Sequence, residues 1–234
     1  MWPKFSFAFQ PIVNVNTHSI VSFEALVRGI NNDPAYQVFQ KVRKDDKYFF
    51  DELLRINAIK LATELGISCN LNLNLLPKSL EMSETAISST LAMAEEVGLA
   101  LNQITIEITE SEIIENYKWF VEAINKYRHF GINIAIDDFG AGYSGLNFLS
   151  ELQPDSLKLD MSLIRDIGKH GPRQAIVRGV IRTSLDLGID IIAEGIETKE
   201  EYLWCAEEGI ELFQGYFFAK PGFEHLPIAI YPCI

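Results

Sequence analysis

The sequence is poor in the residues that bind soft metals or form disulfides. It has 3 cysteines and 4 histidines among 234 residues. Cys69, Cys205 and Cys233 are odd in number and show no Cys-x-x-Cys spacing, which argues against a disulfide framework and against a zinc site. We therefore interpret the cysteines as reduced thiols and expect a cytoplasmic protein.

Basic residues are also few. The sequence has 20 lysines and arginines against 32 aspartates and glutamates, a formal charge of −12. Such a balance disfavours binding to polymeric nucleic acid or to an anionic lipid surface. If the ligand is a small anion, local cations must offset the acidic field, and bound metal ions would do so.

Long apolar runs are missing as well. None approaches the roughly 20 residues of a membrane span, and the N-terminus lacks the pattern of a secretory signal. Neither a low-complexity segment nor an internal linker interrupts the chain, so we expect a single domain over residues 1–234. A sensor or regulatory domain outside this chain remains an open alternative.

One stretch stands out in what is present. Residues 132–136 form an apolar run with β-branched residues, followed by Asp137 and Asp138 and then a glycine-rich loop. This is typical of a buried strand that ends at a functional edge of a parallel α/β fold. Adjacent carboxylates repel each other unless one is protonated or a cation lies between them. The alternative is a solvent-exposed pair that caps the next helix.

Polar residues occur at the ends of other apolar strands in the same way. They are Glu24, Asn74, Glu107, Lys158, Glu194 and Gln214. So many polar residues at strand ends in one chain indicate a shared site. Asn70, Asn72 and Asn74 fall on one strand face because side chains alternate. Asn74 lies furthest toward the carboxyl end and is our candidate for the shared site, with Asn72 as the fallback. The alternative is that these asparagines form a polar ladder inside the barrel.

The order of the predicted elements favours a barrel. Residues 5–15 read as a strand joined by a short turn to a second strand ending near Glu24, a connection too short for a parallel crossover. Strands and helices then alternate, with predicted helices over residues 48–65, 84–97, 112–130, 172–187 and 199–208, each closed by a glycine. The pattern predicts a modified (β/α)₈ TIM-type barrel with an antiparallel first strand pair; a doubly wound sheet is the alternative.

These residues carry a resemblance to a known family. The runs that carry it are Glu24-Ala25-Leu26-Val27-Arg28, Glu107-Ile108-Thr109-Glu110, Asp137 through Ser144, Lys158-Leu159-Asp160, Glu194-Gly195-Ile196-Glu197 and Gln214-Gly215-Tyr216. In this order they resemble the EAL-domain cyclic di-GMP phosphodiesterases. The likeness extends from Gln10 to Pro221, and although one motif is weak, the ordered series is specific.

The resemblance implies hydrolysis of cyclic di-GMP to linear pGpG with two Mg²⁺ or Mn²⁺ ions. Glu24, Asn74, Glu107 and Asp137 would hold one ion, and Asp137, Asp138 and Glu194 the second. Oxygen ligands suit these metals, and two ions can activate a water and stabilise charge on a phosphodiester. The alternative for Glu107 or Glu194 is a cap or a surface carboxylate.

The resemblance also implies roles for the residues around the expected metal ligands. Lys158 would contact the attacking water or the phosphate, with a structural ion pair to Asp160 as the alternative. Arg28 can offer a bidentate fork to a phosphate. The further expected substrate-binding residues are Gln10, Leu26, Asp160 and Pro221, and the expected supporting residues are Glu110, Glu197 and Gln214.

The sequence departs from the commonest family pattern in places. Ala141 and Gly145 stand where Thr and Ser are usual, and residues 29–47 lack the frequent Trp-x-His-Pro region. These features look closer to the branch often linked to light-sensing domains. The resemblance implies a homodimer. The alternatives to an enzyme are a receptor that binds cyclic di-GMP without cutting it and a protein-interaction domain, but every matching position is filled.

Overall fold

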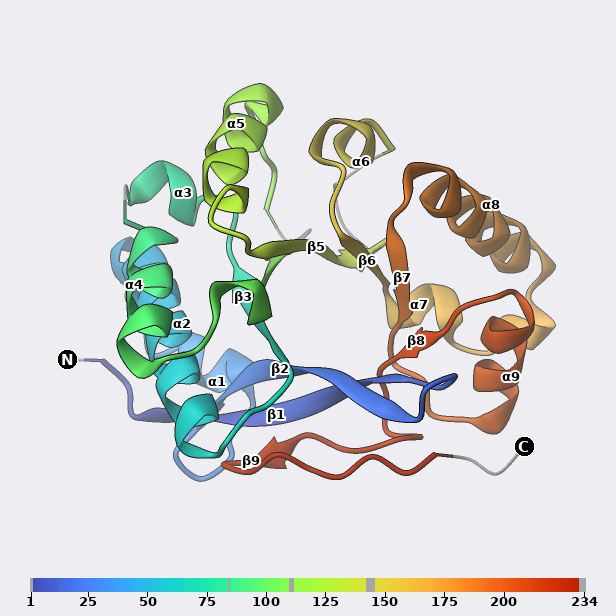
Figure 1. Ribbon diagram of the computed structural model, residues 1–234, viewed down its shortest axis with the longest axis horizontal. Coiled ribbons are helices and arrows are strands. Elements are labelled where there is room, and N and C mark those ends of the chain that lie inside the picture. Colours follow the sequence, from blue (N-terminus) through green and yellow to red (C-terminus); the bar gives the residue numbers. More distant parts are fainter. Residues whose placement is uncertain (1, 84, 110–111, 142–145, 232–234) are drawn as a thin grey trace.

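A ring of strands forms the centre of the molecule (Figure 1). The computed structural model describes residues 2–83, 85–109, 112–141 and 146–231. Neighbouring strands from β2 to β8 run parallel, and β1 closes the ring between β8 and β2, antiparallel to both. The predicted barrel with an antiparallel first strand pair is therefore confirmed.

Nine strands make up the described sheet, and β9 pairs with the edge of β1. The strands are β1 Phe5–Asn14, β2 Ser19–Gly29, β3 Asn70–Leu75, β4 Ile104–Thr109, β5 Asn133–Phe139, β6 Ser156–Leu159, β7 Asp190–Ala193, β8 Leu212–Phe213 and β9 Gly222–Phe223.

The longer helices lie outside the ring (Figure 1). The helices are α1 Ala35–Phe39, α2 Lys47–Glu64, α3 Ser79–Met82, α4 Ser88–Val97, α5 Tyr117–Arg128, α6 Leu146–Leu152, α7 Met161–Ile164, α8 Gly171–Leu187 and α9 Lys199–Glu207, with single 3₁₀ turns at η1 Lys44–Asp46, η2 Leu101–Gln103 and η3 Ile167–Lys169. All five predicted helices are present, and Gly98 and Gly188 end α4 and α8 in the left-handed conformation that glycine adopts without strain.

Three predicted boundaries were wrong. Helix α5 begins five residues later than expected, because the Asn116 side chain caps it by accepting the Trp119 N–H (3.0 Å). Helix α4 begins at Ser88, later than the predicted 84. Strand β2 does not end near Glu24: it continues to Gly29, and Glu24 lies opposite Gln10 in the middle of the ladder. The short helices α1 and η1 lie between β2 and α2.

The parallel strands are buried on both faces, which explains their nearly continuous apolar sequences. In β4, Ile106, Glu107 and Ile108 are all almost fully buried. Side-chain alternation directs the isoleucines toward the outer helices and Glu107 into the ring. The barrel interior thus receives Glu107, while the apolar residues of β4 form part of the helix–sheet core. Within the described ranges, no helix is both long and apolar enough to traverse a bilayer.

Candidate active site

A buried lysine stands at the centre of the polar interior. Lys158 enters from β6, and its side chain is 1% exposed. Its Nζ lies 3.1 Å from Glu24 Oε2, 2.9 Å from Glu107 Oε1, 2.7 Å from Asp137 Oδ1 and 2.6 Å from Glu194 Oε1. The four carboxylates come from β2, β4, β5 and the residue after β7, so the closed ring is what brings them together.

One ammonium does not fully compensate these carboxylates. Burial raises the pKa of Glu107 to about 8 and also raises the pKa of Asp137 and of Glu194. Burial opposes the charge of Lys158 too, but the surrounding carboxylates outweigh it and hold the lysine pKa well above its ordinary value. The lysine is therefore a cation here, and the cluster still has acidic groups that further positive charge would stabilise.

The backbone at the end of β5 brings the neighbouring carboxylates of Asp137 and Asp138 to the same side of the strand. Successive residues of a regular strand would alternate faces. Asp138 instead has a positive φ of 55°, and the pairing of β5 with β6 shifts register between Ile136 and Phe139. Burial, followed by the charge of Asp137, raises the pKa of Asp138 to about 6. This strained conformation is a common feature of functional sites.

The carboxylates form two overlapping groups that share Asp137. Glu24, Glu107 and Asp137 make one group, and Asp137, Asp138 and Glu194 make the other, with oxygen atoms in each within 4.8 Å of one another. Among the described residues, buried Glu107 Oε2 and Asn72 Oδ1 have no hydrogen-bond partner. Unpaired buried oxygen atoms within an oxygen-only donor set fit hard divalent cations such as Mg²⁺ or Mn²⁺.

Both candidate asparagines of β3 touch the acidic cluster. Asn74 Nδ2 donates to Glu24 Oε1 (3.0 Å), and Asn72 Nδ2 donates to Glu107 Oε1 (2.8 Å). Arg55, which sequence reasoning missed, donates from Nη1 to the Asn74 carbonyl (3.1 Å) and pairs with Asp51. The signal that could have found this buried pair was the four-residue spacing of Asp51 and Arg55 on the otherwise apolar face of the helical pattern.

The second carboxylate group opens into a cavity of about 440 Å³. Ten residues expected at the site line it: Gln10, Glu24, Leu26, Asp137, Asp138, Lys158, Asp160, Glu194, Glu197 and Gln214. Met161, Gly195, Gly215 and Tyr216 also line it and were not predicted. Tyr216 stands two residues after Gln214, in the run Gln214-Gly215-Tyr216 that carries part of the resemblance, and this run was the available signal.

Some expected residues have other contacts. Asp160 is not among the described ion-pair partners of Lys158: it caps α7 by accepting the Ser162 N–H (2.9 Å). Gln214 donates to Glu24 Oε2 (2.9 Å). Arg28 lines a second cavity of about 240 Å³ together with Asn74. Pro221 directly precedes β9 and is not among the described lining residues of the main cavity. Glu110 and Gly145 lie outside the described residues.

The arrangement of a barrel, a central lysine and paired carboxylates agrees with a family comparison. A model of the EAL domain matches residues 3–221. The chain belongs to the EAL domain family. Its fold is also that of solved EAL structures: a standalone EAL protein from Vibrio cholerae O395, bound to cyclic di-GMP, is 43% identical with a TM-score of 0.93, covering 98% of this chain and 97% of that one.

Other relatives of this EAL domain are longer proteins. A manganese and cyclic di-GMP complex of Klebsiella pneumoniae BlrP1 is 40% identical with a TM-score of 0.90, covering 94% of this chain and 56% of that one. The Escherichia coli antirepressor BluF, regulated by blue light and temperature, is 37% identical over 97% of this chain and 56% of its own length. The E. coli cyclic di-GMP phosphodiesterase PdeR is 33% identical over 67% of this chain and 23% of its length. The EAL domain thus spans about half or less of these longer relatives.

Proposed function

We propose that this EAL domain hydrolyses cyclic di-GMP to linear pGpG. The observation that supports this best is the pair of carboxylate groups that share Asp137 around buried Lys158, beside a cavity of about 440 Å³. An acidic site is a poor receptor for an anionic dinucleotide unless cations reverse its charge. Named relatives include a cyclic di-GMP phosphodiesterase and a protein crystallised with manganese and this dinucleotide.

Two divalent cations would fit the oxygen donors. Glu24, Asn74, Glu107 and Asp137 would hold one, and Asp137, Asp138 and Glu194 the other. When bound, such ions supply activation of water and stabilisation of charge on the phosphate. The protein contributes the fixed positions of the donors, which come from separate strands of one closed ring.

The side chains of the domain have separate roles in this reaction. A water oxygen forms a bond to phosphorus, the bond from phosphorus to the 3′ oxygen breaks, and that oxygen takes up a proton. Lys158, placed among Glu24, Asp137 and Glu194, would orient the attacking water or the phosphate through its ammonium. Gln214 fixes Glu24, and the register of β1 sets Gln10 opposite Glu24.

The cavity wall offers contacts for the rest of the dinucleotide. Tyr216 is 55% exposed and lines the main cavity, where its ring could stack on a base. Leu26 and Gln10 line the same cavity. Arg28 is proposed as a phosphate ligand, although it lines the second cavity and donates from Nη1 to the Val27 carbonyl (2.9 Å). A change of Arg28 side-chain conformation on binding is therefore part of this proposal.

Chromatography of cyclic di-GMP after incubation with the protein and Mg²⁺ tests the activity directly. Linear pGpG should accumulate with time, and EDTA should prevent its formation. Lys158→Ala should keep the affinity for cyclic di-GMP, measured by calorimetry in Ca²⁺, within about tenfold, or about 1.4 kcal/mol. Turnover should fall by roughly 10²–10³, the usual cost of removing one preorganised donor that stabilises charge in the transition state. Undiminished hydrolysis by this variant would remove Lys158 from the mechanism.

A second candidate function is a receptor that binds cyclic di-GMP without cutting it. The observation that favours it is the 37% identity to BluF, which is named as an antirepressor. The same assay separates the two: a receptor would bind the dinucleotide in Mg²⁺ and return it intact. Retention of all five carboxylates and Lys158 favours the enzyme, because a receptor has no need of a precise two-cation site.

A further inference from the structure

Two loops form one wall of the main cavity. The loop after β6, residues 160–166, includes the short helix α7 and carries Asp160 and Met161. The loop after β7, residues 194–198, carries Glu194, Gly195 and Glu197. Their relative position determines where the Glu194 carboxylate stands with respect to Asp137 and Asp138. The residues that lock these loops together therefore bear on the second carboxylate group, although they do not touch it.

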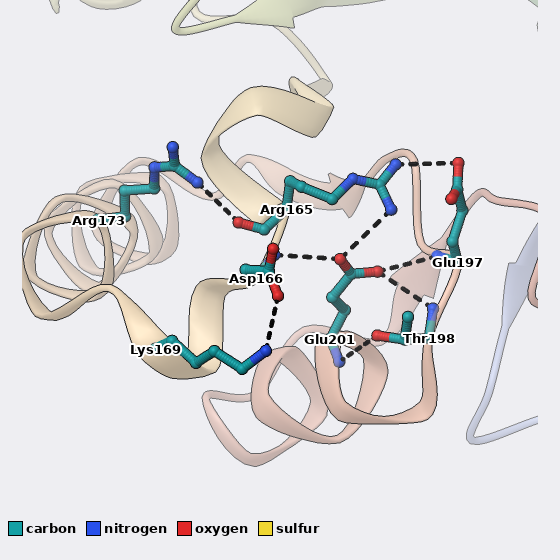
Figure 2. A network of polar contacts seen from close by, with 7 residues as sticks. All are labelled: Arg165, Asp166, Lys169, Arg173, Glu197, Thr198 and Glu201. Atoms are coloured by element: carbon teal, nitrogen blue, oxygen red, sulfur yellow. Dashed lines mark hydrogen bonds and ion pairs between the residues drawn. The ribbon is translucent and has the colours of Figure 1, made fainter.

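The side chain of Glu201 in α9 bridges the two loops (Figure 2). Its Oε1 accepts the Asp166 N–H (3.1 Å), and its Oε2 accepts the N–H groups of Glu197 (3.0 Å) and Thr198 (3.1 Å). Arg165 strengthens the bridge, because its guanidinium contacts Glu201 Oε1 (3.5 Å) and Glu197 Oε1 (2.9 Å). Each oxygen of one buried carboxylate thus holds a different loop.

The charge of Glu201 is matched to this role. Its side chain is almost fully buried. Burial alone would raise its pKa, but the N–H groups of Glu197, Asp166 and Thr198 together with Arg165 hold the pKa below its ordinary value. An ionised carboxylate accepts at both oxygens, whereas an amide of the same shape accepts at only one.

The two loops pack closely against each other at Gly195 and Met161. Gly195 has a φ of +64°, and a Cβ on it would lie 2.4 Å from Met161 Cβ. The Glu194 N–H donates to the Leu159 carbonyl (3.2 Å), and the Ile196 N–H donates to the Gln214 carbonyl (3.2 Å). The segment 194–198 is therefore held between the ends of β6 and β8, and Glu201 secures its far end.

We propose that Glu201 is a positioning residue that sets the place of Glu194 by tying the loop after β7 to the loop after β6. This rests on the proposed two-cation function. Loss of the bridge lets Glu194 move away from Asp137 and Asp138, which weakens the second cation site more than the first. Residues that orient metal ligands typically change metal affinity by about 10- to 100-fold when substituted.

The test compares two substitutions in one hydrogen-bond network. Glu201→Gln removes an acceptor from the bridge, while Thr198→Ala removes only the hydroxyl that caps α9 by accepting the Glu201 N–H (3.2 Å). Mn²⁺ binding to the full chain is measured by calorimetry, and amide hydrogen exchange of Glu194 and Ile196 by NMR. Glu201→Gln should weaken one Mn²⁺ site by about 10- to 100-fold and speed both exchange rates, and Thr198→Ala should leave Mn²⁺ affinity within about threefold.

Each outcome decides a different claim. Unchanged Mn²⁺ affinity and unchanged exchange in Glu201→Gln would overturn the positioning role. If the unsubstituted protein binds no Mn²⁺, the proposed function fails, and the exchange of Glu194 and Ile196 alone decides the role of Glu201. If Glu201→Gln does not fold, Arg165→Gln takes its place, with a smaller change in the same direction expected and no change counting against the proposal.

Discussion

Lys158 acts as the internal counter-ion of the carboxylate cluster, and replacing it with methionine tests this role. The substitution removes the ammonium that contacts four buried carboxylates at 2.6–3.1 Å but keeps a side chain of similar length. Without added metal, Lys158→Met leaves only like charges in the centre of the barrel. The unfolding free energy should then fall sharply, even though some carboxylates become protonated.

The size of the effect follows from the burial of the cluster. Breaking a buried ion pair by removing one partner costs about 3–5 kcal/mol. For a domain of this length each kcal/mol shifts the melting temperature by about 2–4 °C, so we expect a decrease of roughly 10 °C in EDTA. Divalent cations stabilise both proteins, by about 4 kcal/mol at about 1,000 times the Kd, but they should bind the variant more tightly because no ammonium repels them there. The difference between variant and parent should therefore shrink strongly in Mn²⁺.

Thermal unfolding followed by circular dichroism measures the decrease in melting temperature in EDTA and in saturating Mn²⁺. Lys169→Met is the matched control, because Lys169 pairs with Asp166 at the surface and is 81% exposed; surface pairs contribute about 0–1 kcal/mol. A decrease of equal size in EDTA and in Mn²⁺ would refute the reasoning, since it would mean that the lysine stabilises the fold independently of the cation sites.

Four further outcomes are expected. Ca²⁺ should support binding of cyclic di-GMP but not its turnover, because it holds oxygen ligands at longer distances and in looser geometry than Mg²⁺ or Mn²⁺; comparable hydrolysis with Ca²⁺ alone would contradict this. Asp138→Asn should reduce the Mn²⁺ stoichiometry from two to one in calorimetry, because the group of Glu24, Glu107 and Asp137 is untouched; two retained sites of equal affinity would exclude Asp138 as a ligand. Burial raises the pKa of Cys205 to about 12, whereas the thiol of an unfolded chain titrates near 8.5. As the pH rises, the unfolded chain therefore loses this proton first. The unfolding free energy should fall by up to about 1.4 kcal/mol per pH unit between about pH 9 and 12. Chemical denaturation of Cys205→Ala should show a shallower fall, and an identical slope would be the contrary result. The protein should form a symmetric dimer in light scattering; a fully active monomer would disprove that.

The barrel and most of the cavity could be predicted because their signals are local. Strands β2 to β6 carry apolar runs with inward polar residues, and the short turn after Asn14 requires an antiparallel pair. The end of β2 could not be predicted in this way. Glu24 looks like a strand end because it is charged, but its charge is compensated by Lys158, which is 134 positions away in sequence.

Other parts of the site depend on backbone geometry that the sequence does not display. Adjacent aspartates would point to opposite faces of a regular strand, and only the positive φ of Asp138 and the shifted register bring both into one group. Lys158 and Asp160 share a face by alternation, which suggested an ion pair. The chain instead turns after Leu159, so that Asp160 caps α7 while Lys158 remains inside the barrel.

The reversed direction of β1 affects how a longer protein could act on this site. Phe5 pairs with Gly29 and Asn14 with Ser19, so β1 starts at the edge where the parallel strands end. In a barrel of parallel strands only, the first strand would start at the opposite edge. Any module fused ahead of Phe5 would therefore be anchored on the side of the barrel where the parallel strands end, and a pull on that connection would act along the ladder that aligns Gln10 with Glu24.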